Sequence, residues 1–138
     1  MEQTDITIIG AGVIGLAIAA EIARPGLNVF ILEKNHTHGG GISSRNSEVI
    51  HGGIYYLKGS LKGSLCVEGN GMLYEIAEKN HIPHKKTGKL IVAVQKEEEE
   101  SIERLLSDGR ENGATSLELI TQRQASDMEP YVQARAAL

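Results

Sequence analysis

Short apolar runs alternate with glycines through the N-terminal part of the chain. Asp5–Ile9 is a β-branched run that stops at a glycine, which is typical of a buried strand. The small and apolar residues of Val13–Ala23 favour a helix, and Pro25 with the glycine after it ends that helix. Val29–Leu32 is a second apolar run. The order strand, helix, strand predicts a βαβ unit with parallel strands and a right-handed crossover.

Helical spacing returns after residue 60. A helix is predicted over Ser60–Asn80, because apolar residues recur there at intervals of four, seven and four, which places them on one face. These residues are Leu61, Leu65, Met72 and Ile76. A second, amphipathic helix is predicted over Glu97–Asn112, with glutamates at the end where the helix dipole favours negative charge. Its expected buried stripe is Ile102, Leu105 and Leu106, and Gly113 fits the position just after its C-terminal cap.

Three shorter elements are predicted around the second helix. Lys89–Val94 and Leu117–Ile120 are apolar runs of strand length. Thr121 is placed to cap a short helix that ends near Glu129 and Pro130. The whole pattern predicts an α/β fold: a Rossmann-like βαβ unit followed by the start of an α+β domain.

The stretch Ile6–Ala20 contains no charged residue, so a targeting or membrane segment must be considered. A signal peptide would carry basic residues ahead of it, whereas Glu2 and Asp5 are acidic. A membrane span needs about 20 apolar residues, and this stretch is shorter and interrupted by glycines. We interpret it as buried structure of a soluble protein and expect a cytoplasmic location.

Composition narrows the range of partners. The chain has 138 residues, enough for one domain, with a net charge of −4 that argues against a nucleic-acid partner. The lone cysteine, Cys66, excludes an internal disulfide, and its apolar helical neighbours favour packing. His36 and His38 have no supporting cysteine or carboxylate cluster, so no metal site is expected.

The strand-to-helix turn carries a phosphate-binding fingerprint, Gly10-Ala11-Gly12-Val13-Ile14-Gly15. Gly10 permits the tight turn, Gly12 lets a pyrophosphate approach the backbone, and Gly15 lets the helix pack close to the strand. Glu33 follows Gly15 by eighteen positions at the end of the second strand, where a carboxylate accepts hydrogen bonds from a ribose. These residues predict a dinucleotide site. Glu33 argues against NADP but leaves NAD and FAD open.

The segment Ser43–Tyr56, SSRNSEVIHGGIYY, resembles the flavin-contacting segment of FAD-dependent oxidoreductases related to D-amino acid oxidase. The closer resemblance is to the L-2-hydroxyglutarate dehydrogenase/oxidase group, whose pattern N-S-x-V-I-H-x-G-I-Y-Y is matched by Asn46–Tyr56. The likeness continues through Gly59–Lys62 and Leu65–Gly69. It extends to Gly88–Val94, Asn112-Gly113 and Glu129–Tyr131, and so covers essentially the whole chain.

The resemblance implies FAD as the cofactor and hydride transfer from a 2-hydroxy acid to the flavin, with L-2-hydroxyglutarate giving 2-oxoglutarate. Ser44, Asn46 and Ser47 are expected to bond the pyrophosphate or flavin ring, and Arg45 to neutralise phosphate charge. His51 is the candidate catalytic residue for the substrate proton, or else it only bonds a backbone carbonyl beneath the cofactor. The expected cofactor-binding residues are Gly10, Gly12, Val13, Ile14, Gly15, Glu33, Lys34, Ser43, Ser44, Arg45, Asn46 and Ser47.

A rival resemblance lies within the same superfamily. FAD-dependent glycerol-3-phosphate dehydrogenases carry a similar run, and Ser43–Arg45 with His51–Gly53 fit that group slightly better. The long match from Gly59 onward favours the hydroxyglutarate group.

Members of these families are longer than this chain, which implies an N-terminal fragment or a truncated reading frame. Residues 1–80 are then expected to form the first part of the FAD-binding domain and residues 81–138 the beginning of a substrate domain. A non-catalytic nucleotide-binding fragment is a further alternative. The resemblance also implies oxygen or a quinone as electron acceptor and allows association of the longer protein with the inner face of a membrane. Incomplete sheets predict that the isolated chain self-associates.

Overall fold

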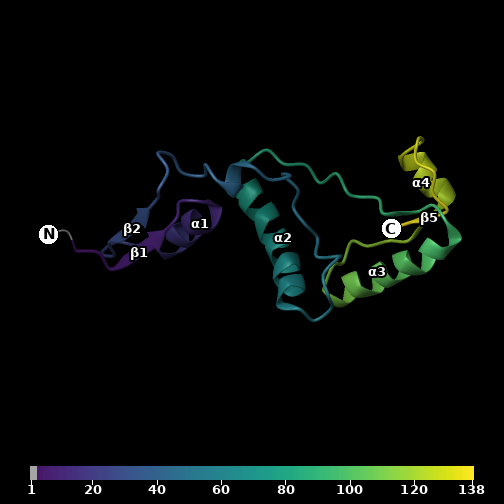
Figure 1. Ribbon diagram of the computed structural model, residues 1–138, viewed down its shortest axis with the longest axis horizontal. Coiled ribbons are helices and arrows are strands. Elements are labelled where there is room, and N and C mark those ends of the chain that lie inside the picture. Colours follow the sequence, from purple (N-terminus) through teal and green to yellow (C-terminus); the bar gives the residue numbers. More distant parts are fainter. Residues whose placement is uncertain (1–2) are drawn as a thin grey trace. The chain divides into compact units, whose positions relative to one another are not determined.

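The computed structural model describes residues 3–138 and divides the chain into two compact units, Met1–Val49 (unit 1) and Ile50–Leu138 (unit 2). Each unit has a sheet of its own, with strand order β1-β2 in unit 1 and β3-β5-β4 in unit 2 (Figure 1). The boundary predicted at residue 80 refers to the domains of a longer flavoenzyme and stays a prediction. The α/β class is confirmed.

Unit 1 is the predicted βαβ element. Strand β1 (Ile6–Ile9) pairs in parallel with β2 (Val29–Leu32), and helix α1 (Val13–Ile22) connects them. The register joins Ile6 to Val29 and runs without a bulge to the ends of both strands. Because the strands end level with each other, the turn after β1 and the residues after β2 meet at one edge. A single 3-10 turn, η1 (Ile42–Ser44), follows.

The expectation that the uncharged N-terminal stretch is buried is wrong for this chain. Helix α1 lies entirely within the described residues, and none of its side chains is buried. Ile9, at the end of β1, is 89% exposed. The physical reason is that the two strands and the helix of unit 1 cover only one face of each other. No second layer of unit 1 covers their remaining faces. Within residues 3–138, no helix combines the length and the apolar character that crossing a bilayer requires.

Unit 2 contains the two longer helices at the predicted positions. Helix α2 (Leu61–Lys79) begins after Ser60, whose hydroxyl accepts the Gly63 N–H at 3.1 Å. The 3-10 turn η2 (Lys96–Glu98) leads into helix α3 (Glu99–Glu111), which ends at Asn112. Both helices therefore carry the caps expected of their sequences.

Acidic residues at the start of the second helical region act as predicted. The Glu98 carboxylate accepts the backbone N–H groups of Val94 and Gln95 at 2.8 and 2.9 Å. These bonds satisfy donors that the first helical turn leaves without partners. They also lower the pKa of Glu98, the Gln95 N–H first and the Val94 N–H second.

The short sheet of unit 2 differs from its prediction in three places. Strand β3 (Val92–Ala93) is shorter than Lys89–Val94, although reciprocal backbone bonds between Ile91 and Leu138 extend its pairing. Strand β4 is Ile120–Thr121, because Leu117 instead packs its side chain over Gly109. Strand β5 (Ala136–Ala137) was not predicted; it lies between β3 and β4 and pairs antiparallel with both.

Helix α4 follows strand β4 as predicted. It spans Gln122–Met128, and Thr121 forms a capping box with Gln124. Small side chains let it pack against the sheet: Ala125, Ala134 and Ala137 form one buried cluster. A second cluster joins Ala93, Ile102 and Leu138, with Leu105 and Leu106 of the predicted stripe packed against it.

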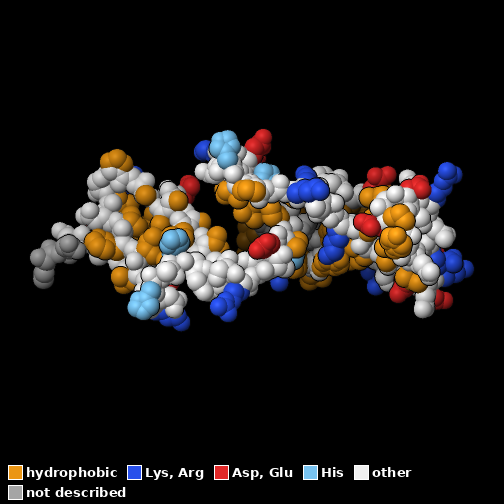
Figure 2. Space-filling view, turned by 90° about the horizontal axis from the view of Figure 1, so that it is seen from above, with side chains coloured by type: hydrophobic (Ala, Val, Ile, Leu, Met, Phe, Trp, Pro, Cys, Tyr) orange, Lys and Arg blue, Asp and Glu red, His pale blue; other side chains and the backbone are white. Residues whose placement is uncertain are grey.

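The apolar stripe of α2 has the predicted spacing but lies on the surface. Figure 2 shows hydrophobic side chains, in orange, at the surface of the molecule. The four residues are more than two-fifths exposed: Leu61 73%, Leu65 55%, Met72 53% and Ile76 46%. Spacing predicted the helix correctly, and unit 2 does not cover this face of it.

The core of unit 2 gives a stability test. Ile102 is 3% exposed and packs in the cluster with Ala93 and Leu138. We expect Ile102→Ala to lower the free energy of unfolding by about 2–4 kcal/mol, because it removes buried methyl groups and leaves a cavity. Leu61→Ala, on the exposed stripe, should change it by less than about 0.5 kcal/mol. Urea unfolding followed by circular dichroism measures both, and equal effects would contradict this assignment of the core.

Candidate functional site

The glycine turn of unit 1 requires glycine at both ends, at Gly10 for its backbone conformation and at Gly15 for space. Gly10 has φ +100°, a left-handed conformation that favours glycine, and its N–H donates to the Leu32 carbonyl at 2.7 Å. A Cβ at Gly15 would collide with the Gly10 carbonyl oxygen. The turn is therefore compact enough for α1 to begin directly against the end of β1.

Glu33 is bonded to this turn. Its Oε2 accepts the Ala11 N–H at 2.9 Å, and its Oε1 accepts the Asn35 backbone and side-chain N–H groups at 2.9 and 2.8 Å. The Asn35 N–H first, and then the Ala11 N–H, hold the pKa of Glu33 below its ordinary value of 4.5. A carboxylate has about four acceptor positions. The three bonds thus fix its orientation and leave capacity for a ribose hydroxyl.

The loop after β2 returns to the start of α1. The Ser43 hydroxyl accepts the Val13 N–H at 2.9 Å, and the Gly39 N–H donates to the Ala11 carbonyl at 2.8 Å. A Cβ at Gly12 would lie 3.2 Å from the Ser43 Oγ. The N–H groups of Ile14 and Gly15 have no intrahelical partner, because they belong to the first turn. This helix end can therefore receive an anion close to its backbone.

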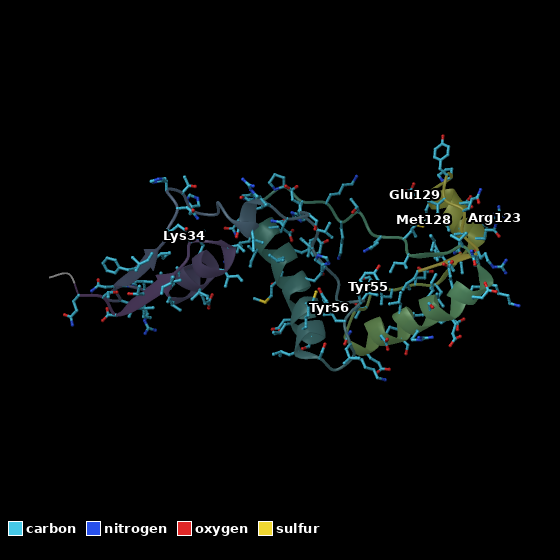
Figure 3. The ribbon with its side chains drawn as sticks, viewed as in Figure 1. Lys34, Tyr55, Tyr56, Arg123, Met128 and Glu129 are labelled. Atoms are coloured by element: carbon cyan, nitrogen blue, oxygen red, sulfur yellow. The ribbon has the colours of Figure 1, made fainter. Side chains whose placement is uncertain are left out.

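The remaining predicted cofactor residues lie on the same loop or beside β2. Ser44 Oγ donates to the Gly41 carbonyl at 3.1 Å, and Asn46 Nδ2 donates to the Ser43 carbonyl at 2.9 Å. Lys34, Arg45 and Ser47 have exposed side chains, and Figure 3 labels Lys34 at the end of β2. Ser43 is thus the loop residue whose side chain contacts the glycine turn.

His51 belongs to unit 2, where its backbone is held by α2. Its carbonyl oxygen accepts Asn70 Nδ2 at 3.0 Å and faces Cys66 Sγ at 3.6 Å. Its side chain is exposed. Two residues later, Gly53 has φ +78°, and a Cβ there would lie 2.7 Å from Val67 Cγ2. The segment His51–Tyr56 therefore runs close against α2 and requires glycine at its bend.

Tyr55 and Tyr56 each carry a lysine over the ring. Lys89 Nζ lies 4.8 Å from the Tyr55 ring centre, and Lys62 Nζ lies 4.5 Å from that of Tyr56 (Figure 3). Such cation–π contacts contribute about 0.5–1 kcal/mol at exposed sites. They orient the two rings.

Sequence patterns missed the residues that act through their backbone or at long range. Ala11 bonds both Glu33 and Gly39 through main-chain atoms, so its side chain gives no signal. Asn70 and Asn112 reach the His51–Tyr56 segment from α2 and from the end of α3. Asn70 is partly buried and Asn112 is buried. The one sequence signal for this is a polar residue at a helical position where an apolar residue is expected. In residues 3–138 no group of three metal-ligating side chains comes together.

Residues 5–138 match the family described as FAD dependent oxidoreductase. The chain belongs to this family. It is 43% identical over its full length to a mitochondrial L-2-hydroxyglutarate dehydrogenase of Caenorhabditis briggsae, of which it covers 32%. It is 43% identical to the protein of the same name from Arabidopsis thaliana, covering 99% of this chain and 28% of that protein. The human protein of that name is 41% identical over 97% of this chain, and the match covers 29% of the human protein.

A solved structure is also similar. Dithionite-reduced L-alpha-glycerophosphate oxidase from Mycoplasma pneumoniae with FAD bound is 30% identical, with a TM-score of 0.80 over 99% of this chain and 37% of that one. The chain thus spans about a third of the length of these proteins. The resemblance to the L-2-hydroxyglutarate dehydrogenases is confirmed, and FAD is the cofactor of the family.

The predicted cytoplasmic location is wrong by the same comparisons. The relatives named above are mitochondrial proteins by name. The prediction depended on the lack of a visible targeting segment. That observation does not determine the compartment of a chain that spans only part of its relatives.

Glu33 should make the glycine turn sensitive to acid. Because its pKa is lowered in the folded chain, its contribution to stability is fully present above about 4.5 and is lost as pH falls through the folded pKa. We expect hydrogen exchange at Ala11 and Asn35 to accelerate over that interval, beyond the intrinsic effect of pH. Glu33→Gln should show faster exchange at pH 7 and no acid transition. Glu21→Gln, an exposed carboxylate on α1, is the control, and an unchanged transition in Glu33→Gln would contradict the assignment.

Proposed function

We propose that unit 1 binds the ADP half of FAD and that the chain supplies this part of a flavoenzyme that oxidises L-2-hydroxyglutarate to 2-oxoglutarate. The observation that supports this most is the Glu33 carboxylate, oriented by Ala11 and Asn35 beside the N-terminal end of α1. In the proposed site this carboxylate would accept a ribose hydroxyl next to a helix end suited to phosphate. Family membership supports FAD over NAD for this arrangement.

Each residue of the predicted site would have a distinct task. The N–H groups of Ile14 and Gly15 would receive the pyrophosphate, while Glu33 would accept a hydrogen bond from the adenosine ribose. Arg45 and Lys34 would neutralise phosphate charge from their exposed positions. The others proposed to line the cofactor are Gly10, Gly12, Val13, Ser43, Ser44, Asn46 and Ser47.

His51 is the candidate for proton transfer. Bound FAD supplies a hydride acceptor for the C–H bond of a 2-hydroxy acid. The His51 imidazole would accept the proton of the substrate hydroxyl, since histidine changes protonation near neutral pH. Its exposed side chain and its backbone carbonyl, fixed by Asn70, are compatible with this role. Oxygen or a quinone would reoxidise the flavin, in the latter case with the longer protein at a membrane.

A second substrate class has a specific observation in its favour. The FAD-bound structure that matches this chain is a glycerophosphate oxidase. The sequences Ser43–Arg45 and His51–Gly53 also fit glycerol-3-phosphate flavoenzymes. The higher identity to L-2-hydroxyglutarate dehydrogenases supports the hydroxy acid as the first choice.

The proposal is tested by adding FAD to the 138-residue chain, removing free flavin, and recording the visible spectrum. We expect a retained flavin band with altered shape, and bleaching by L-2-hydroxyglutarate without oxygen. Bleaching only by glycerol 3-phosphate would favour the second class. Retained flavin without bleaching by either would support a nucleotide-binding fragment, and no retained flavin would contradict the cofactor proposal.

Gly15→Ala is the matched variant for this experiment. Its Cβ would collide with the Gly10 carbonyl, so α1 must move away from the turn and flavin retention should fall more than tenfold. Gly71→Ala adds a Cβ with no atom within 4 Å on α2 and should retain flavin normally. Equal retention by both variants would exclude the glycine turn as the binding site.

We also propose that the isolated chain self-associates. Apolar residues of both units are exposed, among them Ile9 at 89% and Leu61 at 73%. Exposed apolar surface of this kind favours association. Sedimentation velocity should show oligomers whose proportion rises with concentration, and Leu61→Lys with Leu65→Lys on α2 should reduce it. A concentration-independent monomer would contradict this expectation.

A further inference from the structure

We infer that Asn112 is a positioning residue for the segment His51–Tyr56. Its side-chain amide sets the backbone course of the segment that carries the candidate proton acceptor. The inference about the fold concerns unit 2 alone. Its consequence for the cofactor rests on the proposed function.

Asn112 reaches the segment from far along the chain. It is the C-terminal cap of α3 and is 8% exposed. Its Nδ2 donates to the Tyr56 carbonyl at 2.8 Å and to the Gly53 carbonyl at 3.3 Å. One buried amide group thus joins both ends of the bend Gly53–Tyr56, and a buried donor that lost these acceptors would be costly.

The other hydrogen bond and the ion pair at the bend are weaker. Its own backbone bond, from the Tyr56 N–H to the Gly53 carbonyl, is long at 3.4 Å. The nearby ion pair between Lys58 and Glu111 is 3.1 Å long, but both side chains are at least half exposed, and such pairs contribute little. The partly buried bond from the Asn112 amide to the Tyr56 carbonyl, at 2.8 Å, is therefore the shortest hydrogen bond that holds the backbone of the bend.

Packing leaves the Asn112 side chain no alternative position. A Cβ at Gly63 in the first turn of α2 would lie 2.9 Å from Asn112 Oδ1. Gly109, one turn earlier on α3, is close to Ile54, with 3.6 Å from its ideal Cβ to Ile54 Cγ2. Two glycines thus allow α3, α2 and the bend to approach each other around the amide. Gly113 follows with φ +95°, which ends α3 at this point.

The restraint extends to His51 through the other end of the segment. Asn70 holds the His51 carbonyl at 3.0 Å, while Asn112 holds those of Gly53 and Tyr56. The amide groups of two asparagines therefore fix three carbonyl oxygens over six residues. Loss of the Asn112 bonds should loosen the bend and with it the direction in which His51 projects.

The experiment compares hydrogen exchange of peptides covering residues 50–57 in the 138-residue chain and in Asn112→Asp. At pH 7 the aspartate would be charged beside two carbonyl oxygens, and protection there should fall about tenfold relative to the rest of unit 2. At lower pH the protonated carboxyl can donate one hydrogen bond, so protection should partly recover after correction for intrinsic rates. A general loss of stability of unit 2 would not produce this local, pH-dependent recovery.

Two further variants keep the test decisive. Asn112→Ser adds no charge and is too short to reach both carbonyls, so it should lose local protection without recovery in acid. Asn80→Asp alters an exposed asparagine at the end of α2 and should leave the segment unchanged. Unchanged protection in both Asn112 variants, or a uniform loss over α2 and α3 in both, would overturn the inference.

Flavin retention by the same proteins separates this inference from the proposed function. If the unmodified chain retains no FAD, the proposed function fails, while the exchange pattern still decides the role of Asn112. If it retains FAD, the proposed function stands, and the exchange pattern of residues 50–57 again decides the role of Asn112 by itself.

Discussion

The contact between the Gly15 backbone and the Gly10 carbonyl oxygen is the constraint on which unit 1 depends. A side chain at Gly15 has no space, because the Gly10 carbonyl oxygen occupies its position. Helix α1 can therefore start directly beside the ends of β1 and β2. That placement brings the Ala11 N–H within 2.9 Å of Glu33 and the Val13 N–H within 2.9 Å of Ser43. Both ends of the proposed nucleotide site thus depend on one missing side chain.

Unit 2 uses the same physical device with a different result. Gly63 and Gly109 let two helices approach a loop closely, and a buried amide fills the remaining space. A buried polar group must keep its hydrogen bonds. The close packing around the amide therefore also determines the geometry of the loop that it bonds. Small side chains also serve close packing at the sheet, where Ala125 of α4 packs in one buried cluster with Ala137 of β5.

Local signals in the sequence were sufficient for most of the elements. Thr121 caps its helix as predicted, and Glu33, predicted from its interval after Gly15, is bonded to the glycine turn through Ala11. Strand β5 was missed because Ala136 and Ala137 have little strand preference and pair only through distant partners. Asn112 was missed as a contact for the same reason, since its partners lie more than fifty residues away in the chain.

Burial was the property that the sequence predicted least well, and the reason bears on function. Spacing identifies an apolar face, as on α2, but the layer that covers it can come from any distance along a chain. The cofactor features are different, because the glycine turn, Glu33 and Ser43 complete one another within forty-five residues. The chain is similar both to L-2-hydroxyglutarate dehydrogenases and to a glycerophosphate oxidase. Under our proposal, recognition of the nucleotide is therefore determined locally, whereas these local contacts contain nothing that separates the two substrate classes.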